Sequence, residues 1–268
     1  MAKKRTYTLD EVNALRIAYG DPLQKKELIT SLLVPFAVAA VFTFTLFYYW
    51  WLAIITGVIA AIYAYKVILP QNTKRKYEST SFRERNNFIN NITQVLTNPD
   101  RTVLDALKIV SDRSKGEFQE DLLFLQASLI DANSKEQQEA FQIMSNKYKH
   151  DVIFDLYIEQ LATASIEGRF SMDTLKDIKS YHNQIKKKQD EFLAAKEKES
   201  YSFKFITVAS FVLIMAITFT FGWEQFVYVY ARSPIGWFSS AVYLLILSSF
   251  FLSFRKRFVD DNIMEVKV

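Results

Sequence analysis

Few side chains in this sequence have the types and spacing that catalysis or metal binding requires. The 268 residues include two histidines, His150 and His182, and no cysteine. A thiol nucleophile, a disulfide and a histidine-rich or thiolate metal site are therefore excluded. The phosphate loop G-x-x-x-x-G-K-[ST], the zinc motif H-E-x-x-H and the nucleophile motif G-x-S-x-G are also absent. We predict no catalytic, cofactor-binding or metal-binding residue, and a protein that is not an enzyme.

The adjacent pair His150-Asp151 comes nearest to a catalytic arrangement, because a carboxylate can orient a histidine base. Adjacent residues do not face each other on a helix, however, and this pair lies at a predicted junction between two helices. A capping or solvated role is therefore the favoured interpretation.

Charged groups elsewhere have simple interpretations as solvated helix faces. Oxygen ligation of a cation is the alternative for two acidic groups, namely Glu117, Glu120 and Asp121, and Glu136 and Glu139. Attraction to anionic lipids or nucleic acid is a lesser alternative for Lys186–Lys188. The formal net charge of +4 does not require a nucleic-acid partner, because the basic residues cluster beside the apolar segments, and we predict none.

The apolar segments are the strongest feature of the sequence. The mean hydropathy is near zero, yet no charged residue occurs in Leu28–Tyr65, Phe205–Trp223 or Ser233–Phe254. A soluble helix needs one wet face, whereas about 20 apolar residues cross a bilayer core of about 30 Å. These segments therefore predict an integral membrane protein, with the lipid bilayer as its solvent.

Leu28–Tyr65 is too long for one membrane span, so we expect two spans with a turn near Tyr48-Tyr49-Trp50-Trp51. Aromatic side chains prefer the headgroup level, and an aromatic cofactor box is the less favoured alternative. A second pair of spans is predicted at Phe205–Gly222 and Trp237–Phe254, joined by an interfacial loop at Trp223–Gly236. The spans hold no ionisable residue near mid-bilayer except tyrosines, which argues against a small transporter or channel.

Lysine and arginine placement predicts the orientation. Basic residues flank the charge-free segments on the sides of the termini and the central region, whereas the two expected hairpin tips contain only Arg232. Cytoplasmic loops carry the excess of lysine and arginine. We therefore expect a multi-pass protein with both termini and the central region in the cytoplasm.

The central region, which contains one proline and two glycines between Tyr77 and Ser202, is predicted to be helical throughout. Apolar residues recur at helical spacing and predict a bundle of about six helices. The expected helices are Ser79–Thr97, Thr102–Ser114, Glu117–Ala132, Lys135–Lys149, Val152–Ile166 and Met172–Tyr201. The expected core comprises Val103, Leu104, Leu107, Val110, Leu122, Leu125, Leu129, Phe141, Met144, Tyr148, Ile153, Leu156, Leu161, Leu175, Ile178 and Ile185. The last helix is a candidate to continue into the third span.

Capping motifs and helix-breaking residues support these helix boundaries. Thr8 with Glu11, and Ser134 with Gln137, have the spacing of capping boxes. Asn98-Pro99-Asp100 separates two helices, and Gly168 suits a left-handed helix stop. A short helix from Thr8 to Tyr19 is expected near the membrane surface, with a partner contact as the alternative.

Two segments carry a resemblance to a known family. Pro99–Leu107 matches a helix-opening turn followed by x-L-x-x-A-L, and Ser165–Leu175 echoes G-E-x-x-G-x-L-x-x-x-L with compressed spacing. Asp100 and Asn133 stand where glycines are common. In this order, before a membrane hairpin, the patterns resemble the F-domain family of type II secretion systems, and more closely its TadB/TadC-like pilus assembly platform proteins.

The resemblance implies a non-enzymatic platform in the bacterial cytoplasmic membrane that couples a hexameric secretion ATPase to pilin or pseudopilin subunits. It also implies a homo-oligomer, or a hetero-oligomer with a second platform subunit. The expected fold is an all-α membrane protein with two transmembrane hairpins flanking a cytoplasmic bundle. Its expected parts are an N-terminal helix at 1–27, hairpins at 28–69 and 203–254, the bundle at 70–202 and a basic tail at 255–268. The alternative is a membrane signalling or regulatory protein whose bundle binds a cytosolic partner.

Overall fold

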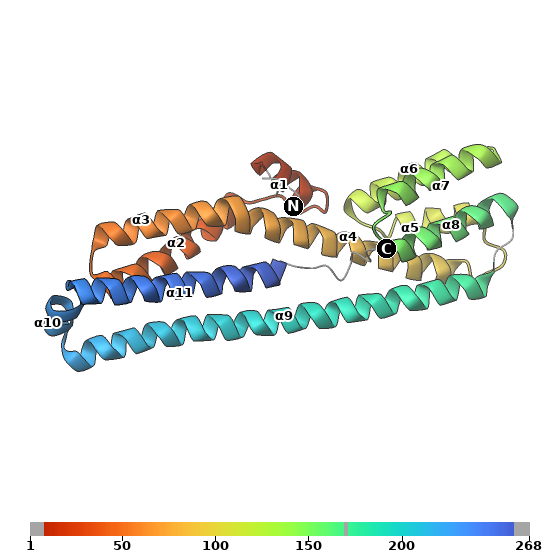
Figure 1. Ribbon diagram of the computed structural model, residues 1–268. Coiled ribbons are helices and arrows are strands. Elements are labelled where there is room, and N and C mark those ends of the chain that lie inside the picture. Colours follow the sequence, from red (N-terminus) through yellow and green to blue (C-terminus); the bar gives the residue numbers. More distant parts are fainter. Residues whose placement is uncertain (1–7, 169–170, 260–268) are drawn as a thin grey trace. The chain divides into compact units, whose positions relative to one another are not determined.

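The computed structural model describes residues 8–168 and 171–259, and within these ranges every regular element is a helix (Figure 1). The helices are α1 (Leu9–Ile17), α2 (Lys25–Phe47), α3 (Trp50–Tyr63), η1 (Ala64–Ile68), α4 (Leu69–Val95), α5 (Val103–Ser111), α6 (Gly116–Leu129), α7 (Ser134–Lys147), α8 (Val152–Glu167), α9 (Met172–Phe221), α10 (Trp223–Gln225), η2 (Phe226–Ala231) and α11 (Pro234–Val259). Four of the helical stretches are long and apolar enough to cross a membrane: Lys25–Phe47, Trp50–Val95, Met172–Phe221 and Pro234–Phe258.

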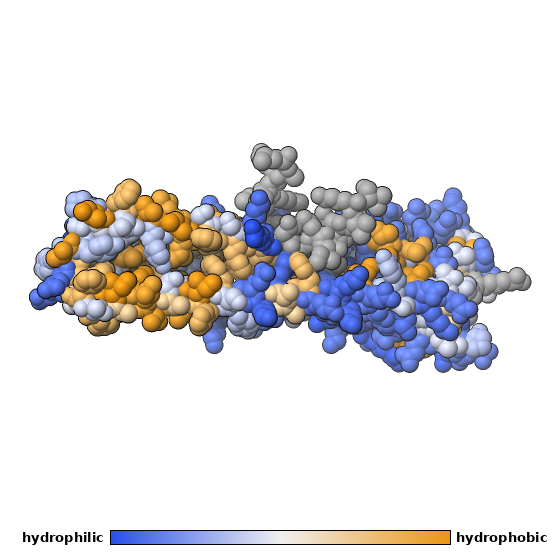
Figure 2. All heavy atoms as spheres, turned by 60° about the horizontal axis from the view of Figure 1, so that its bottom comes forward, coloured by the Kyte–Doolittle hydropathy of each residue, from blue (hydrophilic) through white to orange (hydrophobic). Residues whose placement is uncertain are grey.

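The described chain divides into two compact units. The first, which we call the apolar unit, comprises residues 8–13, 22–74 and 194–259. The second, the bundle unit, comprises residues 14–21, 75–168 and 171–193. On the face that Figure 2 shows, hydrophobic side chains dominate the surface of the apolar unit, whereas hydrophilic side chains dominate the surface of the bundle unit.

The first apolar pair turns where the aromatic cluster predicts. Helix α2 ends at Phe47, Tyr48 takes a left-handed conformation with φ of 55°, and α3 begins at Trp50. The hydroxyl of Thr56 donates to Thr43 Oγ1 at 2.9 Å, which ties α3 to α2. The turn near Tyr48–Trp51 is confirmed.

Helix α3 continues into α4 through one π-helical turn, η1, rather than ending after the apolar residues. The amide of Leu69 bonds the carbonyl of Ala64, five residues back, immediately before Pro70. Proline has no amide hydrogen and crowds the preceding turn, and a π turn is one way for a helix to accommodate it. The predicted start of the first bundle helix at Ser79 is therefore wrong, because no break precedes it.

The connection between α9 and α11 is also more regular than predicted. Within the interfacial loop predicted at Trp223–Gly236, the chain forms α10 and the π-helical η2. The amide of Arg232 bonds the carbonyl of Val227 at 3.0 Å, a five-residue step. This arrangement pairs backbone groups internally, as is required where water is scarce.

The bundle unit has a continuous aromatic and aliphatic core. Most of the predicted core residues are buried, and α4 adds Phe88, Ile89 and Ile92 to them. Leu156 is a wrong prediction, because its side chain is 43% exposed while Phe154, Tyr157 and Ile158 point inward. Helix α8 is apolar over more than one face, so periodicity alone could not select the buried stripe.

Side-chain caps define several helix ends. The Thr8–Glu11 capping box is confirmed, with reciprocal bonds of 2.9 and 3.3 Å. The predicted Ser134–Gln137 box is wrong: Asn133 caps α7, and Glu136 returns a bond of 2.9 Å to the Asn133 amide. Both pairs have the same three-residue spacing, so the sequence did not distinguish them.

Two further expectations about helix ends are confirmed. Gly168 ends α8 in a left-handed conformation, and its amide bonds the carbonyl of Ala164. Helix α9 runs for 50 residues from Met172 to Phe221, so the last bundle helix continues through the third apolar segment. A third expectation is wrong by two residues: the helix predicted to run from Thr8 to Tyr19 ends at Ile17.

The residues that follow α1 contact the bundle. The carbonyl of Ala18 accepts the amide of Glu117 at 2.6 Å, and the rings of Tyr19 and Tyr77 lie 5.5 Å apart. Gly116 makes this approach possible, because its φ is +61° and a β-carbon there would clash with the Ala18 carbonyl oxygen.

Candidate functional site: a buried polar network in the bundle unit

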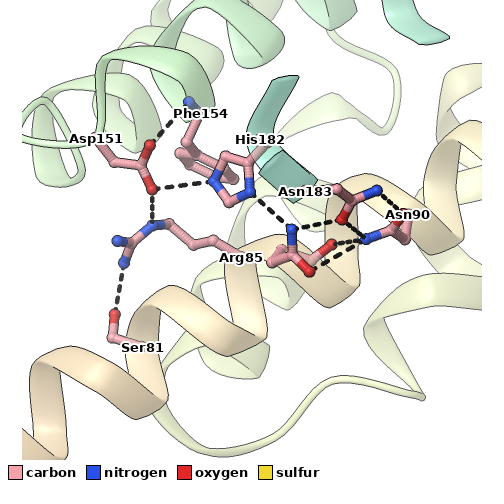
Figure 3. A network of polar contacts seen from close by, with 8 residues as sticks. Ser81, Arg85, Asn90, Asp151, Phe154, His182 and Asn183 are labelled. Carbon is pink, nitrogen blue, oxygen red and sulfur yellow. Dashed lines mark hydrogen bonds and ion pairs between the residues drawn. The ribbon is translucent and has the colours of Figure 1, made fainter. Parts of the chain in front are cut away.

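The most concentrated polar chemistry in the described bundle unit is a buried network formed by three helices (Figure 3). Helix α4 contributes Ser81, Arg85, Asn86 and Asn90, the N-cap of α8 contributes Asp151, and α9 contributes His182 and Asn183. The four-residue steps from Ser81 to Arg85 and from Asn86 to Asn90 place neighbours along the α4 surface. Helical spacing on α4 and α9 thus assembles the network from distant parts of the sequence.

The charged part of the network is the pair of Arg85 and Asp151. Arg85 Nε donates to Asp151 Oδ2 at 2.8 Å, and Arg85 Nη1 donates to Ser81 Oγ at 2.7 Å. The guanidinium also lies 5.0 Å from the ring centre of Tyr148, a cation–π distance. The side chains of Arg85 and Asp151 are only 10% and 9% exposed, so each charge depends on the other for compensation.

His182 extends the network toward three asparagines. Its ring is fully buried and stacks on Phe82 with 4.8 Å between centroids. Nδ1 of His182 lies 2.8 Å from Nδ2 of Asn86, and because an amide NH2 can only donate, Nδ1 accepts. The ring proton therefore lies on Nε2, which is 3.3 Å from Asp151 Oδ2.

The asparagines complete the network. Asn86 and Asn90 each donate to Asn183 Oδ1 at 2.9 Å, and Asn183 donates in return to Asn90 Oδ1. These reciprocal amide bonds bind α4 to α9 through directional contacts that apolar side chains do not make.

The environment of Asp151 favours its charged form. Burial alone would raise the pKa of the carboxyl, but the hydrogen bond from His182 and the charge of Arg85 outweigh burial, so the pKa lies below its ordinary value. Asp151 Oδ1 also accepts the Phe154 amide at 3.1 Å and caps α8. With His182 fully buried and its two ring nitrogens occupied, the arrangement is suited to fixing helix positions rather than to transferring protons to a substrate.

The two residues singled out from the sequence as a possible catalytic pair, His150 and Asp151, lie in different environments. His150 is exposed, so the His150-Asp151 pair is not brought together, whereas the capping role of Asp151 is confirmed. Sequence reasoning missed Arg85, Asn86 and His182 as partners of Asp151. A signal was present in the four asparagines between Asn86 and Asn91, since asparagine is unfavourable inside helices without a compensating role.

The acidic residues of α6 take part in a second cluster at the surface of the bundle. Lys147 lies 2.7 Å from both Glu117 and Asp121, which also accept hydrogen bonds from Tyr77 and Tyr148. Burial alone would raise the pKa of Glu117, but bonds from Lys147 and Tyr77 lower it below the ordinary value.

The remaining acidic candidates do not join this cluster. Glu120 and Glu139 are exposed, and Glu136 belongs to the α7 cap. Within residues 8–168 and 171–259, no group of three histidine, aspartate or glutamate side chains converges as a metal site. Lysine thus occupies the place that a cation would take between Glu117 and Asp121.

The fold defines a class: an all-helical protein with four apolar helices compatible with membrane insertion. The chain is 44% identical over 265 residues to the uncharacterized protein pXO2-23 of Bacillus anthracis, an alignment that covers 99% of this chain and 96% of that protein. It belongs to the same family as that protein. No established family model and no solved structure matches the chain.

Proposed function

We propose that the protein is a non-enzymatic platform of a type II secretion or Tad-like pilus assembly system in the cytoplasmic membrane. In this role its bundle engages a hexameric secretion ATPase, and its membrane helices contact pilin or pseudopilin subunits. It acts as an oligomer, alone or with a second platform subunit. The resemblance of Pro99–Leu107 and Ser165–Leu175 to that family is the starting point of the proposal.

The observation that carries the proposal is the composition of α9. Near its start, Leu175, Ile178 and His182 are buried in the bundle unit, and near its end Phe205 and Leu213 are exposed apolar side chains of the apolar unit. The helix passes from one unit into the other without a break in its hydrogen bonding, and this continuity suits a protein that couples a bundle to a membrane segment. The satisfied network around Arg85 and Asp151 supports the same role, because it anchors α9 to α4 and α8.

The proposal includes a topology. The apolar helices form two transmembrane hairpins that flank a cytoplasmic bundle, with both termini in the cytoplasm. The distribution of lysine and arginine supports this orientation. Exposed Trp50, Trp51, Trp223 and Tyr228 near the two turns suit the opposite headgroup region.

The absence of cysteine makes the topology directly testable, because any introduced cysteine is the sole thiol. Glu224→Cys probes the second turn, and Glu167→Cys probes the bundle; both positions are exposed. A membrane-impermeant maleimide should label the Glu224→Cys variant in intact cells, and the Glu167→Cys variant only after the cells are permeabilised. The reverse pattern would overturn the orientation.

A partner surface is available on the bundle. Phe124 of α6, Ile130 directly after α6 and Ile143 of α7 are more than half exposed, and the last two line a shallow pocket of about 290 Å³. Ile130 and Ile143 lie together at this pocket, so a partner that contacts it would cover both apolar side chains. We place the ATPase contact here.

The partner test is crosslinking in membranes followed by purification in mild detergent. Wild-type protein should recover a secretion-type ATPase, and Phe124→Ser with Ile143→Ser should reduce that recovery. Tyr181→Ser is the matched control, since Tyr181 is equally exposed on α9. Recovery of a signalling protein in place of an ATPase and pilins would favour the regulatory alternative and reject the platform.

A further inference from the structure

One cavity in the apolar unit contains a polar group whose hydrogen-bonding capacity is not used. The cavity has a volume of about 660 Å³, within the range of small-molecule sites, and lies among the end of α2, the last turns of α9, η2 and the start of α11. Its walls are mainly apolar, with Leu213, Ile217, Phe226 and Val229 among them. Such a lining suits a hydrocarbon chain better than water.

Ser240 of α11 is the exception in this wall. The residue is 1% exposed, and its hydroxyl has no hydrogen-bond partner among the described residues. A buried hydroxyl is normally paired, and an unpaired one in a native structure calls for a ligand or another explanation. Ser240 is therefore an independent sign that the cavity is occupied in the membrane.

The hydroxyl of the neighbouring Ser239, in contrast, has hydrogen-bond partners. Its hydroxyl lies 2.9 Å from the Ile235 carbonyl and 2.7 Å from the Tyr230 hydroxyl. Both serines belong to the same helix and the same cavity wall, yet only Ser240 lacks a partner among the described residues. The difference separates a hydroxyl with satisfied hydrogen bonds from one whose hydrogen-bonding capacity is unused.

We propose that this cavity binds one acyl chain of a glycerolipid and that the Ser240 hydroxyl donates a hydrogen bond to the ester carbonyl of that chain. An ester lipid supplies both features that the cavity requires, an apolar chain and a hydrogen-bond acceptor near its polar end. A transmembrane helix from another protein fits less well, because its backbone carbonyls are already bonded within the helix. The inference requires insertion in a membrane and is independent of the platform function.

The position of Ser240 along α11 suits the depth at which the ester groups of a membrane lipid lie. Ser240 is six residues from Pro234, the first residue of α11, or about 9 Å along the helix. The aromatic residues Trp223 and Trp237, which suit the headgroup level, belong to the same connection and helix start. An acyl chain whose ester group lies just below this level extends along the apolar wall formed by α9.

The test compares two lipids that differ only in the carbonyl groups of their ester linkages, which the ether analogue lacks. Full-length protein in detergent is incubated with dioleoyl phosphatidylglycerol or with its dioleyl ether analogue, and bound lipid is counted by native mass spectrometry. Wild type should retain one ester lipid and bind the ether lipid roughly 2- to 10-fold more weakly, the effect of one hydrogen bond. Ser240→Ala should bind both lipids equally, and Ser239→Ala should keep the preference for the ester.

A second variant tests the contribution of the cavity to lipid binding separately from that of the hydroxyl. Ser240→Leu places a larger apolar side chain in the cavity wall, removes the hydroxyl and should abolish retention of both lipids, while size-exclusion chromatography and the helical circular dichroism signal verify that the variant is folded. Equal binding of ester and ether lipids by wild type would overturn the proposal. So would a failure of wild type to retain either lipid, or retention that Ser240→Leu leaves unchanged.

Discussion

The bundle unit and the apolar unit are both helical, but they differ in where their large apolar side chains lie. In the bundle unit the large apolar side chains are buried, as with Phe88, Phe118 and Tyr157. In the apolar unit they face outward, and Phe205 and Phe219 are 75% and 69% exposed. Since exposure of this kind is costly in water and favourable in lipid, the comparison teaches that helical periodicity is informative only together with the solvent.

Their polar groups differ in the same way. The bundle unit holds an ion pair and several side-chain caps, whereas α2 and α3 begin without a side-chain cap. Threonines of the apolar helices bond backbone carbonyls of their own helix instead, as Thr45 and Thr218 do. Water can solvate an uncapped helix end, but a hydroxyl in lipid must find its partner within the protein.

The largest effect is expected from creating a cavity in the bundle core. Phe118→Ala should lower the free energy of unfolding by about 3–5 kcal/mol, because Phe118 is fully buried among Phe88, Tyr148 and Phe154. Phe124→Ala, on the same helix but exposed, should change it by less than about 0.5 kcal/mol. Hydrogen exchange of the α6 amides measures both; equal effects would contradict the assignment of faces.

A charge placed on an exposed apolar position should distinguish the two solvents. Leu213→Lys, in the middle of the apolar part of α9, should make membrane insertion less favourable by roughly 3–4 kcal/mol, because lysine opposes insertion at mid-span and leucine favours it. Phe124→Lys replaces a similarly exposed apolar side chain in the bundle unit and should leave insertion unchanged. The fraction of protein resistant to carbonate extraction reports the difference. Unchanged extraction of the Leu213 variant would mean that this segment does not lie in lipid.

Acid should weaken the bundle unit through Asp151. Because the folded state lowers the pKa of this carboxyl, its contribution to stability is complete above the ordinary value of 3.8 and is lost as the pH falls through the lower folded value. Hydrogen exchange in α4 and α8 should therefore accelerate on acidification in this range. Asp151→Asn should reduce the pH dependence, even where it lowers stability at neutral pH, and an unchanged dependence would assign the effect to other carboxyls.

The smallest effect concerns the cap of α7. Asn133→Ala should destabilise the helix start by about 1 kcal/mol, because the Asn133 side chain accepts the amides of Lys135 and Glu136. Ser134→Ala should be nearly neutral, since Ser134 is the first residue inside the helix rather than its cap. Hydrogen exchange at the first turn of α7 measures both, and a larger effect at Ser134 would restore the capping box predicted from the sequence.

Much of the fold was predictable because it depends on local patterns. The charge-free segments predicted the apolar helices, the aromatic cluster predicted the turn at Tyr48, and Gly168 predicted the end of α8. The predicted element boundaries were less accurate where two backbone hydrogen-bonding patterns have similar local energies. The π turns at Ala64–Ile68 and Phe226–Ala231 depend on how backbone bonds are shared over five residues, which no residue type encodes clearly.

The partners within the candidate sites were not predictable, because they depend on distant residues. Asp151 was singled out, but beside His150 rather than His182, which lies 31 positions further along the chain. Ser240 looks no different from Ser239 in the sequence, and only the surroundings of each hydroxyl distinguish them.

The sequence by itself determined where helices form, which of them are apolar enough for a membrane and which turns separate them, because these properties follow from residues within one or two helical turns. Tertiary structure alone decided that Arg85, Asp151 and His182 meet in the bundle core and that Ser240 is left without a partner among the described residues in the wall of a cavity. The physical reason is that hydrogen bonding and burial depend on what packs opposite a side chain, and helix packing brings together residues that local spacing does not relate.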